Sequence, residues 1–147
     1  MNRSSQIIIF GSVTGLVLIS INRIRLLAQL KQVYNNYKGL VYCWGGTTPE
    51  TGFDCSGFAY YVYNNYLGIK TNRTTAQKLS ERSRKVFIPR PGDLIFFKNN
   101  TGKIDHVGIY INSTKMLHSG GSSGVSYADF TNSFWAPRVS FIGRLKR

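Results

Sequence analysis

Cysteine, histidine and acidic residues are all scarce in this chain. It has 2 Cys and 2 His among 147 residues, and only 6 Asp and Glu against 19 Lys and Arg. Two cysteines form at most one disulfide, which excludes a disulfide-stabilised scaffold and a four-cysteine zinc module. The net charge of +13 attracts polyanions, but it does not distinguish nucleic acid from anionic lipid or a phosphate-rich wall polymer.

Apolar residues, by contrast, are sufficient for a folded core. Hydrophobic residues make up 42% of the chain, aromatic residues 14% and charged residues 17%, a composition that excludes a disordered basic tail. The length allows one domain. We predict that it covers residues 25–147, after a separate segment at residues 1–24.

That N-terminal segment contains an apolar run at residues 7–21. As a helix the run would extend about 22 Å, less than the roughly 30 Å hydrocarbon core of a bilayer. Because no small-x-small cleavage site follows it, we favour an uncleaved membrane anchor over a cleaved signal peptide or a buried first helix. Basic residues are more frequent after the run, at Arg23, Arg25 and Lys31, than before it. The positive-inside rule then places the C-terminal part on the inner side of a membrane.

The rest of the chain has helical patterns first and strand patterns afterwards. Apolar residues at three- and four-residue spacing predict helices over residues 25–38 and about 55–66. A capping box, with Thr74 as the N-cap and Gln77 three residues later, predicts a short third helix. Short apolar or alternating runs predict strands at residues 94–97, 106–111, 115–119 and 139–145. This order indicates an α+β fold with an antiparallel sheet.

One cysteine stands at the predicted start of a helix. Cys55 lies within the segment FDCSG, where the positive end of the helix dipole favours the thiolate and therefore nucleophilic attack. The alternative is a small apolar residue in the core. Cys43 has no such position, and we interpret it as a buried thiol rather than as the partner of Cys55 in an inhibitory disulfide.

Both histidines fall in predicted strands that can form a hairpin. With a three-residue loop, Tyr110 lies opposite Met116 and Gly108 opposite His118. His106 then lies diagonal to His118 on one face, at roughly 7 Å between backbone positions, so their imidazoles can share a hydrogen bond. A four-residue loop would put them on opposite faces. A purely structural histidine pair is the alternative to a catalytic one.

Six segments occur in the order typical of one enzyme family. They are YCWGG at 42–46, FDCSG at 53–57, NRTTAQ at 72–77, PGDLIFF at 91–97, HVGIY at 106–110 and MLH at 116–118. Through these segments the chain, from about residue 26 to residue 147, resembles the NlpC-type cell-wall cysteine peptidases.

The resemblance implies a papain-like fold and a set of catalytic roles. Cys55 would be the nucleophile, His106 the general base and His118 the residue that orients the base. In such a site the thiolate attacks a peptide carbonyl and the imidazolium protonates the leaving amine. The Cys55 backbone N–H and the Tyr42 hydroxyl would stabilise the oxyanion.

The resemblance also implies a substrate. Asp54, Ser56, Arg73 and Tyr42 would bind the free amino end of a peptidoglycan stem peptide, with Asp54 pairing with the ammonium group. The residues alone also allow simpler roles, Asp54 as a helix N-cap and Arg73 as a surface charge. We interpret Trp44 as a packed aromatic side chain, and the two glycines after it as tight backbone beside the cleft.

These observations predict a peptidoglycan endopeptidase, with no cofactor and no metal, that cuts the stem peptide between D-γ-glutamyl and the diamino acid. An amidase that removes the stem from the sugar, or an acyltransferase, would use the same layout. A non-catalytic basic protein that binds wall or membrane is an alternative of another class. Nucleic acid is disfavoured as a partner, because the basic clusters at residues 82–85 and 144–147 are short and no recognition motif accompanies them.

The expected location is membrane-associated, either in a bacterial cell envelope or in the membrane or particle of a bacterial virus. A virus would also accommodate a catalytic part on the inner side of the membrane.

Overall fold

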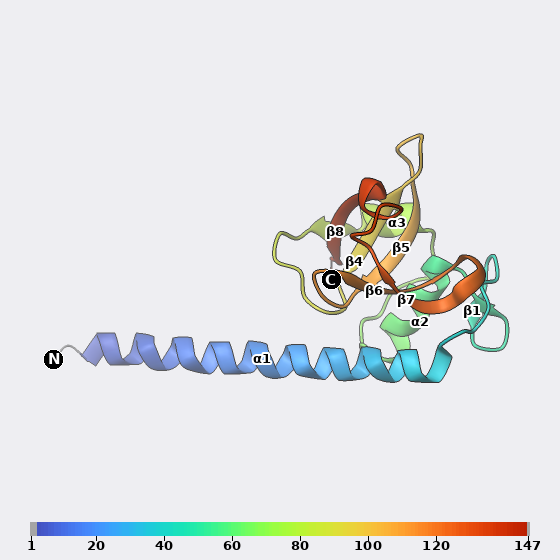
Figure 1. Cartoon of the computed structure of the whole chain (residues 1–147). Coiled ribbons are helices and arrows are strands. Elements are labelled where there is room, and N and C mark those ends of the chain that lie inside the picture. The colour runs from blue at the N-terminus through green and yellow to red at the C-terminus, as the bar shows by residue number, and fades with distance from the viewer. Residues whose placement is uncertain (1–2, 147) are drawn as a thin grey trace.

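The computed structural model describes the backbone of residues 3–146 and the side chains of residues 14–146. One long helix, α1 (Arg3–Tyr37), leads into the globular part of the molecule (Figure 1). We expected a membrane segment and a separate helix from residue 25, but the two are continuous, because no proline interrupts these 35 residues. The C-terminal end of α1 is fixed by packing, since Leu30 and Val33 are fully buried.

The expected anchor at residues 7–21 lies on the part of α1 that projects away from the globular part (Figure 1). The side chains of residues 7–13 are outside the described residues. Where side chains are described, this part of the helix exposes apolar groups, with Leu16 at 65% and Leu18 at 62% exposed. In the described part of the chain, no helix is both long enough and apolar enough to cross a membrane.

A six-stranded antiparallel sheet forms the body of the globular part. Its spatial order is β3-β8-β4-β5-β6-β7. The strands are β3 (Ser83–Lys85), β4 (Leu94–Lys98), β5 (Ile104–Tyr110), β6 (Lys115–Gly120), β7 (Gly124–Asp129) and β8 (Val139–Leu145). The four predicted strands are confirmed as β4, β5, β6 and β8, whereas β3 and β7 were not predicted.

The smaller elements surround this sheet. They are the helices α2 (Cys55–Asn65) and α3 (Ala76–Glu81), the two-residue strands β1 (Thr47–Thr48) and β2 (Gly52–Phe53), and the 3₁₀ turns η1 (Gly121–Ser123) and η2 (Ala136–Arg138). The fold is therefore α+β, as the sequence predicts, with the three α-helices preceding the six-stranded sheet.

The sheet has an apolar layer on each face. The larger core joins α1, α2 and α3 to one face of the sheet and includes Phe53, Phe58, Phe96 and Leu117. The smaller cluster lies on the opposite face and consists of Ile95, Phe97, Met116 and Phe130, with Trp135 packed against it. Neighbouring residues of one strand fall in different clusters, as Phe96 and Phe97 do, because side chains alternate between the two faces.

The third helix begins one residue later than the capping box predicts. Thr75, not Thr74, is the N-cap, and its hydroxyl accepts a hydrogen bond from the Lys78 backbone N–H at 3.3 Å. Gln77 does not reach back to the cap. Its Oε1 accepts from the Ile104 backbone N–H at 3.0 Å, so Gln77 joins α3 to β5 instead.

Candidate active site

Cys55 is the first residue of α2, at the position the sequence predicts. The residue is 7% exposed, and its Sγ lies 3.9 Å from the Asp105 carbonyl oxygen on β5. Burial raises the pKa of this thiol to about 11, although a hydrogen bond from the Val107 backbone, together with Arg73, lowers it. Loss of hydration therefore opposes the helix dipole at this position and favours the neutral thiol in the resting protein.

The two histidines form the predicted pair. The β5–β6 hairpin sets Tyr110 opposite Met116, which is the register of a three-residue loop. His106 Nε2 and His118 Nδ1 then lie 2.9 Å apart and share a hydrogen bond. Burial lowers the pKa of His106 to about 3, with His118 as a further cause, and that of His118 to about 4. Both imidazoles are therefore neutral at pH 7.

Trp135 covers this pair, and sequence reasoning missed it. Its ring lies over His106 with the centroids 4.9 Å apart and 32° between the planes, and it stands edge-on to His118 at 5.4 Å. The turn before it is held by the Asn132 Oδ1, which accepts from the Trp135 N–H at 2.9 Å. No sequence signal identifies this role, since Trp135 lies far along the chain from both histidines.

The predicted residues form two groups. Cys55 lies with Asp54, Ser56 and Arg73 on the α2 side, and His106 lies with His118 among the aromatic rings on the sheet. Within the described residues no hydrogen bond joins Cys55 to either histidine. The thiol instead contacts the backbone of the residue that precedes His106, so the two groups adjoin at β5.

Asp54 organises the start of α2, as its N-cap. Its Oδ1 accepts from the Gly57 N–H at 2.6 Å and from the Ser56 hydroxyl at 3.2 Å. Its Oδ2 accepts from the Gly45 N–H at 2.9 Å and from Arg73 Nη2 at 2.6 Å. All four lone-pair positions of the carboxylate are thus occupied.

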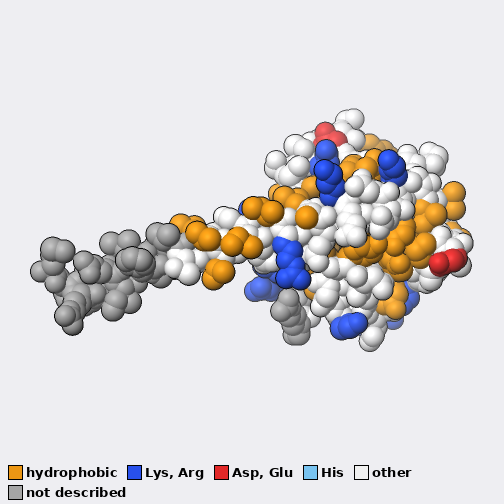
Figure 2. Space-filling model, turned by 90° about the horizontal axis from the view of Figure 1, so that it is seen from below, with side chains coloured by type: hydrophobic (Ala, Val, Ile, Leu, Met, Phe, Trp, Pro, Cys, Tyr) orange, Lys and Arg blue, Asp and Glu red, His pale blue; other side chains and the backbone are white. Residues whose placement is uncertain are grey.

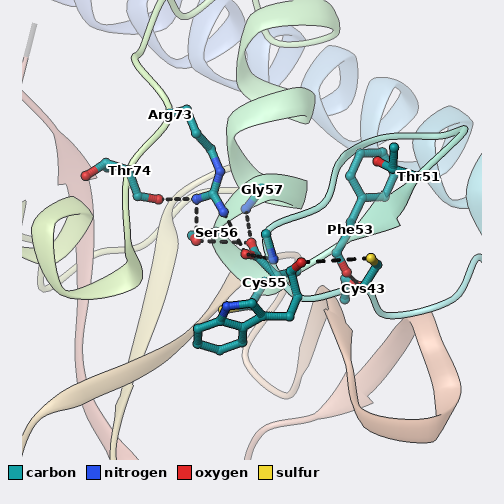
Figure 3. Close-up of polar contacts among 12 residues, drawn as sticks. Cys43, Thr51, Phe53, Cys55, Ser56, Gly57, Arg73 and Thr74 are labelled. Atoms are coloured by element: carbon teal, nitrogen blue, oxygen red, sulfur yellow. Dashed lines mark hydrogen bonds and ion pairs between the residues drawn. The ribbon is translucent and has the colours of Figure 1, made fainter.

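Arg73 is fixed in this network rather than solvated as a surface charge. Figure 3 shows its guanidinium directed at Ser56 and the start of α2, with Nη1 donating to the Ser56 hydroxyl at 2.8 Å and to the Thr74 carbonyl. The side chain of Arg73 is 32% exposed, whereas that of Asp54 is 10% exposed. Arg73 is therefore not a solvated surface charge. Asp54 is a helix N-cap, and this role does not exclude a second one in binding substrate.

A cleft of about 790 Å³ opens beside these residues. Its lining includes Tyr42, Cys55, Ser56, Arg73 and Asp105, with Trp44 at its edge. Burial raises the pKa of Tyr42, and the nearby Cys55 and Asp54 raise it further, which places the Tyr42 hydroxyl among the polar groups around the thiol.

In the segment before the cleft, the structure corrects the interpretation of Trp44 and supports that of Gly46. Trp44 is 88% exposed, so it is not a packed aromatic residue but an open apolar surface at the cleft. Gly46 does need to be glycine, because a Cβ there would lie 2.3 Å from the Gly52 carbonyl oxygen. Cys43 is half-buried, and both cysteines are free thiols.

No group of three His, Cys, Asp or Glu side chains in the described part of the chain could hold a metal ion. The groups that the site presents are a thiol, an imidazole pair and a carboxylate–guanidinium network beside the cleft.

The NlpC/P60 family model matches residues 39–144, which include every residue of this site. The chain belongs to the NlpC/P60 family. It is 38% identical to the bifunctional muramidase/DL-endopeptidase CwlT of Bacillus subtilis, over 75% of this chain and 34% of that protein. It is 35% identical to a probable endopeptidase NlpC homolog of Haemophilus influenzae, over 73% of this chain and 56% of that protein.

Solved structures agree on the fold. An NLP/P60 family protein from Staphylococcus aureus matches 84% of this chain and 42% of its own, with 29% identity and a TM-score of 0.72. The NlpC/p60 domain of the peptidoglycan hydrolase SagA matches 84% of this chain and 98% of its own, with a TM-score of 0.62. Most of the chain thus matches one NlpC/P60 domain, and the chain spans about a third to about half of the length of the two curated relatives.

Proposed function

We propose that this protein is a cysteine endopeptidase that hydrolyses peptidoglycan stem peptides, at the bond between D-γ-glutamyl and the diamino acid. The observation that carries the proposal is the placement of Cys55 at the start of α2, against β5, the strand that carries His106, whose ring is paired with His118 on β6. The names of relatives support the reaction class, since they include a DL-endopeptidase and a murein DD-endopeptidase.

In the proposed reaction the thiol starts neutral. Sγ leaves the Asp105 carbonyl and passes its proton to the free nitrogen of His106 as it attacks the substrate carbonyl. His106 then gives this proton to the leaving amine, and a water molecule hydrolyses the thioester. His118 fixes the orientation of the His106 ring through their hydrogen bond at 2.9 Å.

The oxyanion that forms during attack needs donors. The backbone N–H of Cys55, at the N-terminus of α2, and the Tyr42 hydroxyl in the cleft are the two proposed ones. The thioester step involves no group outside the chain other than substrate and water.

Asp54 has no unused lone pair for the amino end of a stem peptide. An incoming ammonium must therefore replace one of its present donors. The Ser56 hydroxyl is the longest of the four contacts, at 3.2 Å, and can rotate away. We infer that the amine binds between Asp54 and Ser56, while Arg73 stays in place.

Digestion of purified peptidoglycan tests the proposal. The full chain is expected to release fragments whose masses correspond to cleavage within the stem, and Cys55→Ala is expected to release none. Cys43→Ala is the matched control, which should keep the activity. Stems released intact would indicate an amidase, and acylated lipid with unchanged walls would indicate an acyltransferase.

A non-catalytic binding protein would give a different result. In that case Cys55→Ala would bind and affect walls as the unchanged chain does, which would overturn the endopeptidase proposal.

The location is a separate part of the proposal. We propose that residues 7–21 hold the enzyme at a membrane surface, in a bacterial envelope or in a bacterial virus particle. The apolar exposed turns of α1 support contact with a membrane surface. Protease treatment of intact cells or particles tests it. Release of the catalytic part without membrane disruption would exclude an internal location.

A further inference from the structure

A second pocket, of about 620 Å³, lies where α1 meets the globular part. Its walls come from α1, the C-terminal end of α2, the turn before β4, and the paired strands β3 and β8. None of its lining residues lines the catalytic cleft. We call it the basic pocket, and its charged lining residues are Arg25, Arg84, Arg90, Asp93, Arg144 and Lys146.

The single carboxylate of the basic pocket is already fully engaged. Asp93 is 2% exposed. It accepts from Arg144 Nε at 2.7 Å and from Nη2 at 2.8 Å, and also from the Arg90 backbone N–H at 2.9 Å. This bidentate pair fixes the Arg144 guanidinium and uses the negative charge of Asp93.

Three further cations face the same pocket without an acidic partner. In the described part of the chain, Arg25, Arg84 and Lys146 form no ion pair. Arg84 lies directly opposite Arg144 in the β3–β8 register, and like charges in that position repel each other. An anion in the pocket would remove this repulsion, and phosphate suits it because guanidinium groups bind phosphate oxygens in pairs.

The helix that forms one wall of the pocket indicates where such a phosphate comes from. Immediately before Arg25, α1 exposes Ile19, Ile21 and Ile24 at 57%, 57% and 67%. Figure 2 shows apolar side chains along the described part of the projecting helix, Lys and Arg side chains where the helix meets the globular part, and acidic side chains only at the margins of this face. Apolar groups beside cations match the acyl and headgroup layers of an anionic membrane surface.

We infer that the basic pocket binds the phosphate of an anionic lipid headgroup when the exposed turns of α1 lie in the membrane surface. The catalytic cleft is lined by other residues, so it stays open to substrate. Headgroup binding does not depend on the chemistry of Cys55, and failure of either proposal leaves the other intact.

A pair of double variants of the full chain tests the inference. Arg84→Gln/Lys146→Gln removes two cations from the pocket, and Lys38→Gln/Lys98→Gln removes the same charge from exposed positions outside it. The assay is co-sedimentation with phosphatidylcholine vesicles, with and without phosphatidylglycerol. The pocket variant is expected to lose about tenfold to thirtyfold in affinity for the phosphatidylglycerol vesicles, and the control less than about threefold. Both should digest peptidoglycan as the unchanged chain does.

A second measurement separates a lipid from a free phosphate. Inorganic phosphate is titrated while the amide chemical shifts of Gly92 and Asp93, in the pocket wall, are followed. Shifts that vanish in the pocket variant, together with its selective loss of vesicle binding, support the inference. If phosphate shifts these amides in the unchanged chain but not in the pocket variant, while the pocket and control variants bind vesicles equally well, the pocket is assigned to a soluble phosphate and the lipid assignment is overturned. Equal loss in both variants, or equal binding to the two kinds of vesicle, would overturn it as well.

Discussion

The ion pair between Asp54 and Arg73 gives the sharpest test of the active-site network. The two changes are Asp54→Asn, which keeps the shape of the N-cap, and Arg73→Gln, which removes the charge and leaves a shorter hydrogen-bond donor. Arg73 Nη2 lies 2.6 Å from Asp54 Oδ2, and the side chain of Asp54 is only 10% exposed. Each single variant, and the double variant, is made in a Cys43→Ala background so that Cys55 is the only thiol.

The size of the effect on stability follows from the surroundings. Exposed pairs contribute up to about 1 kcal/mol, and removing one partner of a fully buried pair costs about 3–5 kcal/mol. Arg73 is 32% exposed and Asp54 keeps three other donors, so each single change should cost about 1–2 kcal/mol in free energy of unfolding. Because both singles lose the same contact, the double-mutant cycle should give a coupling of about 1 kcal/mol.

The effect on the thiol separates the two residues. Burial is the main reason why the pKa of Cys55 is raised, but the charge of Asp54 raises it further and Arg73 lowers it. Arg73→Gln should therefore raise this pKa, and Asp54→Asn should lower it, although both destabilise the fold. The assay is the pH dependence of Cys55 alkylation by iodoacetamide, with denaturant unfolding measured in parallel. If both variants shift the alkylation profile in the same direction, the electrostatic reasoning is refuted.

Three further predictions concern the packing and the protonation of the site. Gly57→Ala should lower the free energy of unfolding by about 3 kcal/mol, because its Cβ would lie 2.0 Å from the Gly46 carbonyl oxygen. An unchanged midpoint of denaturant unfolding would contradict the placement of α2. Trp135→Ala should rehydrate His106, raise its pKa toward the ordinary 6.5 and move the acid limb of kcat/KM to higher pH, whereas an unmoved limb would show that the ring does not shield it. Burial holds the pKa of His106 at about 3 and that of His118 at about 4, so between about pH 6.5 and 4 the unfolded chain protonates both imidazoles while the folded chain keeps them neutral. The free energy of unfolding should then decrease by at least about 1 kcal/mol for each unit by which the pH is lowered over this range. A flat profile of thermal midpoints would contradict this.

The hairpin that carries the histidines could be predicted because its determinants are local. A loop of fixed length sets the register, and the period of two then decides which face each residue occupies. The observed pairing of Tyr110 with Met116 and the contact between the two rings follow from these rules. The start of α2 was predictable for a similar reason, since Asp54 is an effective N-cap.

Other features depend on contacts between distant segments. Gln77 matches a capping box, but its side chain has a better partner in β5, and the cap moves to Thr75. Trp44 was expected to be packed, yet it lies in a turn before β1 and is 88% exposed. Strand β3 has only three residues, two of them charged and exposed. It therefore lacks the alternation of apolar and polar residues by which a strand is predicted from sequence.

The protonation state of the nucleophile shows why a local rule can fail even when the position is correct. A helix N-terminus contributes up to about 1 kcal/mol for an exposed charge, which is less than one pKa unit. Burial in this site raises the pKa of the thiol from 9.0 to about 11, a difference of about 3 kcal/mol. Burial also holds His106 neutral, so it disfavours an ion pair between a Cys55 thiolate and a His106 imidazolium before substrate binds. Burial therefore favours transfer of the proton during attack, when the charge that develops on the substrate oxygen can be stabilised by the start of α2.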